Sequence, residues 1–296
     1  MGTTAGLTPE RVLRRLEWQV IRRLDGRLQG DYRTLLRGHG TDFRDMRTYQ
    51  WGDDVRFIDW SVTARMDELF VREFMEDREL TAWLLLDRSP SMAFGAVERT
   101  KERVLCELAA TFGQLLVRGG NRVGAIVYDG DQQRTILPRQ GRNQVLALVG
   151  ELLRPVGGGS LTDLKVLLDR AARLVRRRSL VVLISDFISE PGWERPLLRL
   201  TERHEVVAVR LVDPREYELP DAGLVYVQDA ESGEQLLVDT SDPELRRRLS
   251  AVAEEQDEAI RRTVARARVD LHVVSTEDDL LGAFVRMAGA GHRRRR

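Results

Sequence analysis

Short apolar runs alternate with longer amphipathic segments along most of this 296-residue chain, and this alternation constrains the fold more than any other feature. Short apolar runs bounded by turn residues are typical of buried strands, and a 3.6-residue periodicity is typical of helices. The predicted strands are 82–86, 122–128, 132–137, 179–185, 205–211 and 269–274, with a further hairpin near 224–239. The predicted helices are 97–117, 142–153, 162–176, 193–202, 242–267 and 277–288. This order predicts the α/β class: a doubly wound, mostly parallel sheet with helices on both faces.

The first 80 residues have a different pattern. Thr8 and Pro9 are typical of a helix start, and an amphipathic segment with a basic face follows them. Residues 31–80 are weakly periodic, which predicts a small β-rich or irregular segment. We therefore expect three parts. They are an N-terminal helix and segment packed on the main domain (1–80), the α/β domain (81–290) and a disordered basic tail (291–296).

Composition excludes several classes of protein. The 47 basic residues balance the 47 acidic ones, so a dominant nucleic-acid-binding role is not expected. Cys106 is the sole cysteine, which excludes an intrachain disulfide and a four-cysteine zinc site. No apolar run reaches the roughly 18 residues of a transmembrane segment. The first ten residues also lack the pattern of a secretory signal, so we expect a cytoplasmic protein.

A polar motif directly follows the first predicted strand of the sheet. The strand ends in Asp87, and Ser89 and Ser91 follow at alternate positions. Ligands of open α/β sheets bind at the carboxyl ends of the strands. Carboxylate and hydroxyl oxygens suit hard cations, and a donor set with few carboxylates favours Mg²⁺ or Mn²⁺ over Ca²⁺. The motif therefore predicts a metal site at this edge.

Two later strand–helix junctions carry similar side chains. The glycine run 157–159 precedes Ser160, Thr162 and Asp163, and the strand 179–185 leads into Asp186. A six-coordinate cation needs oxygens from several segments, so the three junctions together predict one site. Each signal is weak by itself: Thr162 is also a candidate helix N-cap, and Ser160 is a rival ligand.

The three junctions together resemble the metal-ion-dependent adhesion site of von Willebrand factor type A domains. That pattern is Asp-x-Ser-x-Ser after the first strand, a Thr after a glycine-rich loop and a later Asp. The matching positions are Asp87, Ser89, Ser91, Thr162 and Asp186. The resemblance implies that the three hydroxyls bind Mg²⁺ or Mn²⁺ directly and that the two carboxylates act largely through bound water. It also implies an open coordination position for an Asp or Glu of a protein partner.

The upstream segment Gly52–Trp60, with the sequence Gly-Asp-Asp-Val-Arg-Phe-Ile-Asp-Trp, carries a second resemblance. It is similar to the signature of the bacterial family called domain of unknown function 58, whose members carry a type A domain directly afterwards. The resemblance implies a MoxR-type AAA+ ATPase as partner, in chaperone-like assembly or maturation of a client protein. The interleaved Asp and Arg residues predict a semi-buried ion-pair network, with a docking surface as the alternative. Trp51 and Trp60 are predicted core anchors.

We expect a binding module without catalysis of its own. The alternative is a metal-dependent phosphatase or hydrolase with Asp87 as nucleophile. Ser89 stands where that chemistry requires a second Asp, and no phosphate-binding loop with a lysine follows the glycine run. A third possibility is membrane or nucleic-acid binding through the basic first helix and Arg293–Arg296, which the zero net charge disfavours.

Overall fold

The chain divides into two units in a computed structural model. The structure describes residues 8–24, 46–50, 55, 58–66, 68–72, 80–96, 99–156, 162–218, 220–228 and 235–293. The larger unit consists of Met1–Leu36 with Leu80–Arg296, and the smaller unit is Arg37–Glu79. The predicted packing of the signature segment on the main domain stays a prediction.

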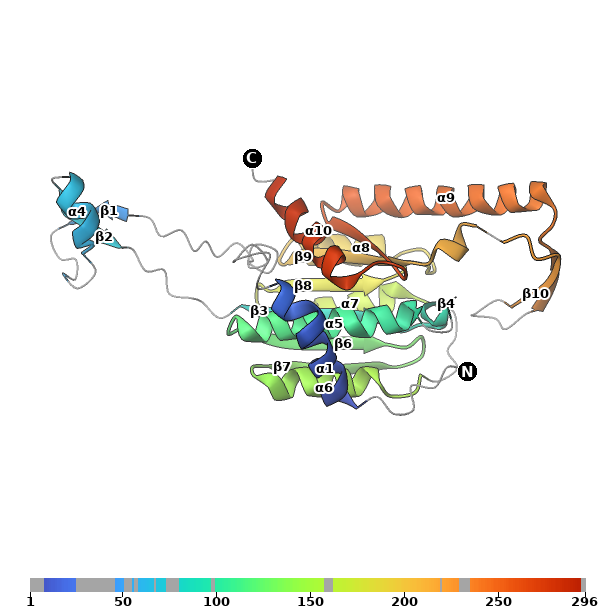
Figure 1. Cartoon of the computed structure of the whole chain (residues 1–296), viewed down its shortest axis with the longest axis horizontal. Helices are drawn as coiled ribbons and strands as arrows, with labels where there is room; N and C mark the ends of the chain where they lie inside the picture. The colour runs from blue at the N-terminus through green and yellow to red at the C-terminus, as the bar shows by residue number, and fades with distance from the viewer. Residues whose placement is uncertain are drawn as a thin grey trace. The chain divides into compact units, whose positions relative to one another are not determined.

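The larger unit is built on one six-stranded sheet with the strand order β12-β9-β8-β3-β6-β7 (Figure 1). The strands are β3 (Thr81–Asp87), β6 (Arg122–Tyr128), β7 (Gln133–Arg139), β8 (Leu180–Ser185), β9 (Glu205–Val212) and β12 (Asp270–Ser275). Five strands are parallel, and β7 is antiparallel to β6. The predicted α/β fold class is therefore confirmed. The strand β3, which carries the predicted metal motif, lies between β6 and β8.

Helices cover both faces of this sheet because the strand side chains alternate between two apolar cores. Leu84 and Leu86 of β3 belong to one core, and Trp83 and Leu85 belong to the other. The first core contains residues of α1 (Pro9–Leu16), η1 (Glu17–Ile21), α5 (Lys101–Arg118), α6 (Arg142–Leu152) and α10 (Leu280–Arg293). The second contains residues of α7 (Leu164–Leu174), α8 (Glu194–Thr201) and α9 (Pro243–Arg266). No helix among the described residues is long and apolar enough to cross a membrane.

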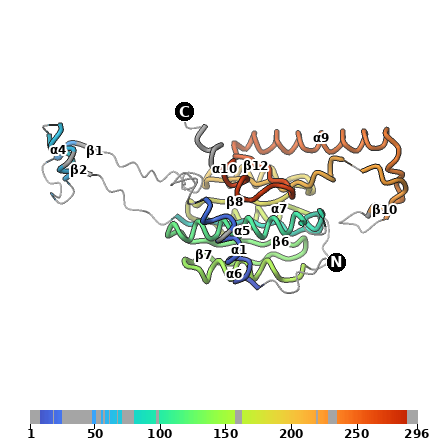
Figure 2. Tube along the Cα trace, in the orientation of Figure 1, coloured from blue at the N-terminus to red at the C-terminus, as the bar shows by residue number. Residues whose placement is uncertain are grey.

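The first helix is part of the larger unit. Thr8 caps α1, since its hydroxyl accepts a hydrogen bond from the Arg11 N–H at 3.4 Å. The helix contacts both α5 and α6, and Figure 2 shows its trace passing in front of them. Its apolar residues Leu13 and Leu16 are buried. The predicted helix start and apolar face are thus confirmed.

The smaller unit contains a short antiparallel pair, β1 (Met46–Thr48) with β2 (Phe70–Arg72), and the helix α4 (Trp60–Met66). Asp59 precedes the helix, and its Oδ1 accepts a hydrogen bond from the Val62 N–H at 3.3 Å. Trp60 is 66% exposed, so the prediction that it anchors a core is wrong. Trp51, Asp53, Asp54 and Arg56 lie outside the described residues.

Three predicted helix boundaries differ from the structure. The helix expected from residue 97 begins at Lys101, because β4 (Gly95–Ala96) and β5 (Arg99–Thr100) form a short hairpin first. Gly95 has φ +138°, and a Cβ there would lie 2.8 Å from Thr100 Cα. The last helix begins at Leu280 rather than 277 and extends to Arg293, so the predicted start of the tail at 291 falls inside it.

The second predicted hairpin is confirmed. It consists of β10 (Leu224–Gln228) and β11 (Gln235–Asp239), which pair antiparallel. The turn residues between them lie outside the described part of the chain.

Candidate metal site

Asp87 ends β3 and is completely buried. Its Oδ1 accepts a hydrogen bond from the Ser89 N–H at 2.9 Å, and its Oδ2 accepts one from the Ser185 hydroxyl at 2.6 Å. It forms no ion pair with any residue that the structure describes. Burial, and secondly the negative charge of Asp186, raise the pKa of Asp87 to about 6. This buried carboxylate therefore lacks a cationic partner among the described residues.

Ser89 and Ser91 place two hydroxyl groups directly after this carboxylate. Both residues are buried, and their Oγ atoms lie 3.2 Å apart. The short helix η3 (Pro90–Ala93) holds them in place, since the Met92 N–H donates to the Ser89 carbonyl at 3.0 Å. The turn explains why residues two apart in sequence present neighbouring oxygens.

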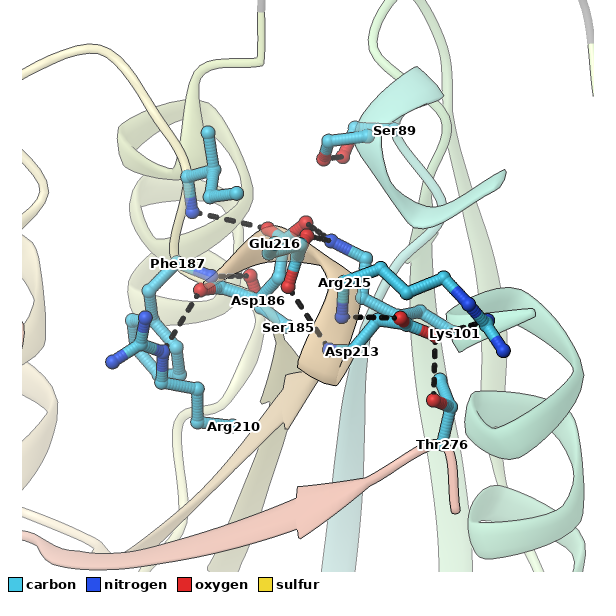
Figure 3. A network of polar contacts seen from close by, with 12 residues as sticks. Ser89, Lys101, Ser185, Asp186, Phe187, Arg210, Asp213, Arg215, Glu216 and Thr276 are labelled. Carbon is cyan, nitrogen blue, oxygen red and sulfur yellow. Dashed lines mark hydrogen bonds and ion pairs between the residues drawn. The ribbon is translucent and has the colours of Figure 1, made fainter. Parts of the chain in front are cut away.

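Asp186 follows β8 and carries an ion pair that the sequence analysis did not foresee. Its Oδ1 accepts a hydrogen bond from the Ile188 N–H at 3.0 Å. Its Oδ2 lies 2.7 Å from the Nζ of Lys101, which also contacts Oε1 of Glu216 (Figure 3). Glu216 ends the short helix η4 (Pro214–Glu216). Burial, the largest influence on Lys101, lowers its pKa, but Asp186 and Glu216 together raise it above the usual value.

The segment before α7 is attached to the same edge of the sheet. Thr162 is buried, and its carbonyl accepts hydrogen bonds from the Glu190 N–H at 2.9 Å and the Ser189 hydroxyl at 3.2 Å. The Asp163 N–H donates to the Tyr128 hydroxyl at 3.1 Å. Asp163, rather than Thr162, is the N-cap of α7. Thr162 thus approaches the loop after β8 through its backbone.

The rival ligand Ser160 and the glycine run 157–159 lie outside the described residues. The choice between Ser160 and Thr162 as a metal ligand therefore stays open.

Arg88, which lies between Asp87 and Ser89, connects the carboxyl edge of the sheet to the end of α6. Its side chain is 4% exposed, and its Nε donates to Glu102 Oε1 at 3.0 Å. Its terminal nitrogens donate to the carbonyls of Glu151 at 3.4 Å and Arg154 at 2.9 Å. These carbonyls lie at the C-terminal end of α6, where a cation is favourable. Arg88 therefore holds the segment that leads into the glycine run.

The structure links four of the predicted ligands, Asp87, Ser89, Ser91 and Asp186, by hydrogen bonds or by charge. No three His, Cys, Asp or Glu side chains in the described part of the chain cluster in a way that would hold a metal. A metal here would therefore depend on the serine hydroxyls. The donor chemistry fits Mg²⁺ or Mn²⁺, because all the candidate atoms are hard oxygens and Asp87 is a buried anion.

Sequence reasoning missed Lys101, Glu216, Tyr128 and Arg88. The one available signal was that Lys101 is one of only two lysines in an arginine-rich chain. The contacts of the other three depend on segments far away in the sequence.

The sheet and the polar loop at its carboxyl edge define an α/β protein with a six-stranded, mostly parallel sheet covered by helices on both faces. The profile described as "Protein of unknown function DUF58" matches residues 45–259. The chain belongs to this family.

Two relatives are described as uncharacterised proteins. The chain is 38% identical over 283 residues to "Uncharacterized protein Rv1480" of Mycobacterium tuberculosis, covering 95% of this chain and 89% of the relative. It is 30% identical over 106 residues to "Uncharacterized protein YeaD" of Bacillus subtilis, covering 36% of this chain and 24% of the relative.

Two solved structures are similar at low sequence identity. One is the conserved hypothetical protein BatB of Bacteroides thetaiotaomicron, with a TM-score of 0.46 and 16% identity, covering 72% of this chain and 99% of that one. The other is the SpRpn10 VWA domain, with a TM-score of 0.39 and 12% identity, covering 70% of this chain and 94% of that one.

Proposed function

We propose that this chain is a metal-dependent protein-binding module. Ser89, Ser91 and Thr162 would hold Mg²⁺ or Mn²⁺ directly, and Asp87 and Asp186 would support it largely through water. When bound, the cation supplies a positive field that favours one more anionic oxygen, which a partner's Asp or Glu provides.

The observation that carries this proposal is that Asp87 is a buried carboxylate with no cationic partner among the described residues. A buried carboxylate without a cation is unfavourable, and its pKa of about 6 reflects this. A divalent cation beside it would relieve that cost, and the two serine hydroxyls 3.2 Å apart offer neutral ligands next to it. A protein that kept this arrangement without binding a cation would be destabilised by it.

We further propose that the partner is a MoxR-type AAA+ ATPase and that the chain acts as an adaptor between the ATPase and a client protein. The family resemblance suggests this partner class. The chemistry of the site requires only that the partner present a carboxylate.

We also propose that the chain has no catalytic activity of its own. As a nucleophile Asp87 would need exposed oxygens, but it is completely buried and both of its oxygens accept hydrogen bonds. The alternative of a phosphatase or hydrolase built on Asp87 is therefore less well supported than a binding role.

The double variant S89A/S91A is expected to lose metal-dependent capture of a purified MoxR-type ATPase from the same organism. Both hydroxyls are proposed ligands, so their removal leaves the cation without two direct contacts. Capture by the immobilised full chain would be measured in Mg²⁺ and in EDTA. We expect retention in Mg²⁺ and loss in EDTA for the wild type, and no retention in either condition for the variant.

The matched control is Ser179→Ala. Ser179 is also buried, but it precedes β8 at the opposite edge of the sheet, and its hydroxyl donates to the Arg177 carbonyl at 2.8 Å. This variant should behave like the wild type. Equal capture in Mg²⁺ and EDTA by the wild-type chain would contradict the proposal.

A further inference from the structure

Lys101 has an unusual position for a lysine. It is one of two lysines among the 47 Lys and Arg residues, and its side chain is completely buried. It is the first residue of α5, directly after the N-cap Thr100. Positive charge is disfavoured at a helix N-terminus, so the position itself does not call for a lysine. The carboxylates that face Lys101 account for its presence.

The ammonium group contacts two carboxylates from different parts of the chain. Its Nζ lies 2.7 Å from Asp186 Oδ2 and also contacts Glu216 Oε1, as Figure 3 shows. The ring of Phe94 lies on another side, with its centroid 5.8 Å from Nζ. An ammonium is a compact point charge, whereas the guanidinium used elsewhere in this chain is a broad planar fork. A compact cation bound by buried carboxylates resembles a small metal ion in its electrostatic role.

The charges at this edge explain what the lysine does for the predicted metal ligands. Asp186 acts on Asp87 through its negative charge. Asp87, Asp186 and Glu216 carry three negative charges, and Lys101 carries one positive charge. The formal sum is −2, and without Lys101 it would be −3. A divalent cation held by Asp87 and the serines would therefore be repelled by an ammonium already seated on Asp186.

We propose that Lys101 is a built-in counter-ion that neutralises Asp186 in the metal-free protein and weakens the binding of divalent cations at the neighbouring site. This inference rests on the proposed metal site. In this view Lys101 is a positioning residue. It holds Asp186 in place when no metal is bound, and its charge lowers the affinity of the site for metal. A purely structural ion pair would stabilise the fold without affecting cation affinity.

The test is a Mn²⁺ titration of the full chain, in which the electron paramagnetic resonance signal of free Mn²⁺ reports binding. Methionine has a similar length without the charge, so K101M should bind Mn²⁺ at least tenfold more tightly than the wild type. K101R keeps the positive charge, so its Mn²⁺ affinity should stay within threefold of that of the wild type. The matched control K165M removes an exposed lysine that pairs with Asp169 at 3.2 Å, and it should also stay within threefold.

The second readout is the thermal unfolding temperature, which can still be interpreted if K101M folds poorly. Without metal, K101M should unfold at a lower temperature than the wild type, because it leaves Asp186 unpaired and buried. Saturating Mn²⁺ should raise the unfolding midpoint temperature of K101M more than it raises that of the wild type. If K101M folds only when Mn²⁺ is present, the proposal is supported; if it fails to fold at every Mn²⁺ concentration, the proposal is overturned.

The possible results separate this inference from the proposed function. Equal or weaker Mn²⁺ binding by K101M than by a wild type that binds Mn²⁺ overturns the role of Lys101 and leaves the metal site standing. Absence of binding by both proteins overturns the metal site and the inference together. Tighter binding by K101M with no metal-dependent capture of the ATPase overturns the partner and supports the inference.

Discussion

Replacing Arg88 with methionine is expected to lower the free energy of unfolding by about 2 to 4 kcal/mol. The guanidinium is buried and contacts Glu102 and the carbonyls of Glu151 and Arg154. Its loss leaves the partly buried Glu102 without its cation and removes the donor at 2.9 Å to the Arg154 carbonyl, whereas the Glu151 carbonyl keeps the Arg154 N–H at 3.2 Å. Glu102 is 35% exposed, so water offsets part of the loss. Urea denaturation followed by circular dichroism would measure the change.

A matched control for this variant is Arg154→Met in the same neighbourhood. The Arg154 side chain is 62% exposed and pairs with Glu151 at 3.1 Å. Exposed pairs of this kind contribute about 0 to 1 kcal/mol. Similar losses for the two variants would show that burial of Arg88 does not matter. Because Arg88 holds the segment before the glycine run, R88M should also weaken Mn²⁺ binding.

Replacing Asp87 with asparagine is expected to stabilise the metal-free protein and to abolish its response to metal. The raised pKa means that the ionised carboxylate is less favourable in the folded protein than in the unfolded chain. A shift from 3.8 to about 6 corresponds to roughly 2 to 3 kcal/mol at pH 7. Asparagine removes this cost, and its amide oxygen can still accept the Ser89 N–H. The wild type should gain stability from Mg²⁺, and D87N should not.

The pH dependence tests the same prediction with a definite sign. The folded state binds the Asp87 proton more tightly than the unfolded state does. The protonated Asp87 carboxyl therefore adds its full stability below pH 4, and this added stability is lost as the pH rises to about 6 and the folded protein loses the proton. D87N has no carboxyl group at this position, so its stability does not depend on this proton. Between pH 4 and pH 7, D87N should therefore become increasingly more stable than the metal-free wild type. Urea titrations at several pH values in EDTA would measure the difference.

Asp129→Asn provides the control for D87N. Asp129 also follows a strand and is buried, but it lies 3.9 Å from the Arg134 guanidinium and accepts the Gln132 N–H at 2.7 Å. We expect this variant to keep the metal response and to gain no stability. A pH-independent difference between D87N and the wild type would show that Asp87 is not strained by its burial.

Local patterns were sufficient to predict most of the elements. The apolar run before Asp87 predicted β3, and the Asp129-Gly130-Asp131 turn predicted the β6–β7 hairpin. They failed where a close approach between distant segments decides the geometry. Gly95, for example, lies against Asp213 Oδ2, since a Cβ there would be 3.3 Å from that atom. The hairpin of β4 and β5, which begins at Gly95, occupies the start of the helix predicted from residue 97, so this helix begins at Lys101.

The sequence by itself determined the α/β class, the position of each strand of the six-stranded sheet and the candidate ligands Asp87, Ser89, Ser91 and Asp186, because these depend on periodicity and on residues close together in the chain. Only the tertiary structure decided the order of the strands and the partners of the charged groups. Lys101 meets Asp186 from 85 residues away and Glu216 from 115 residues away. Such pairs arise from the packing of whole elements, and no local pattern encodes them.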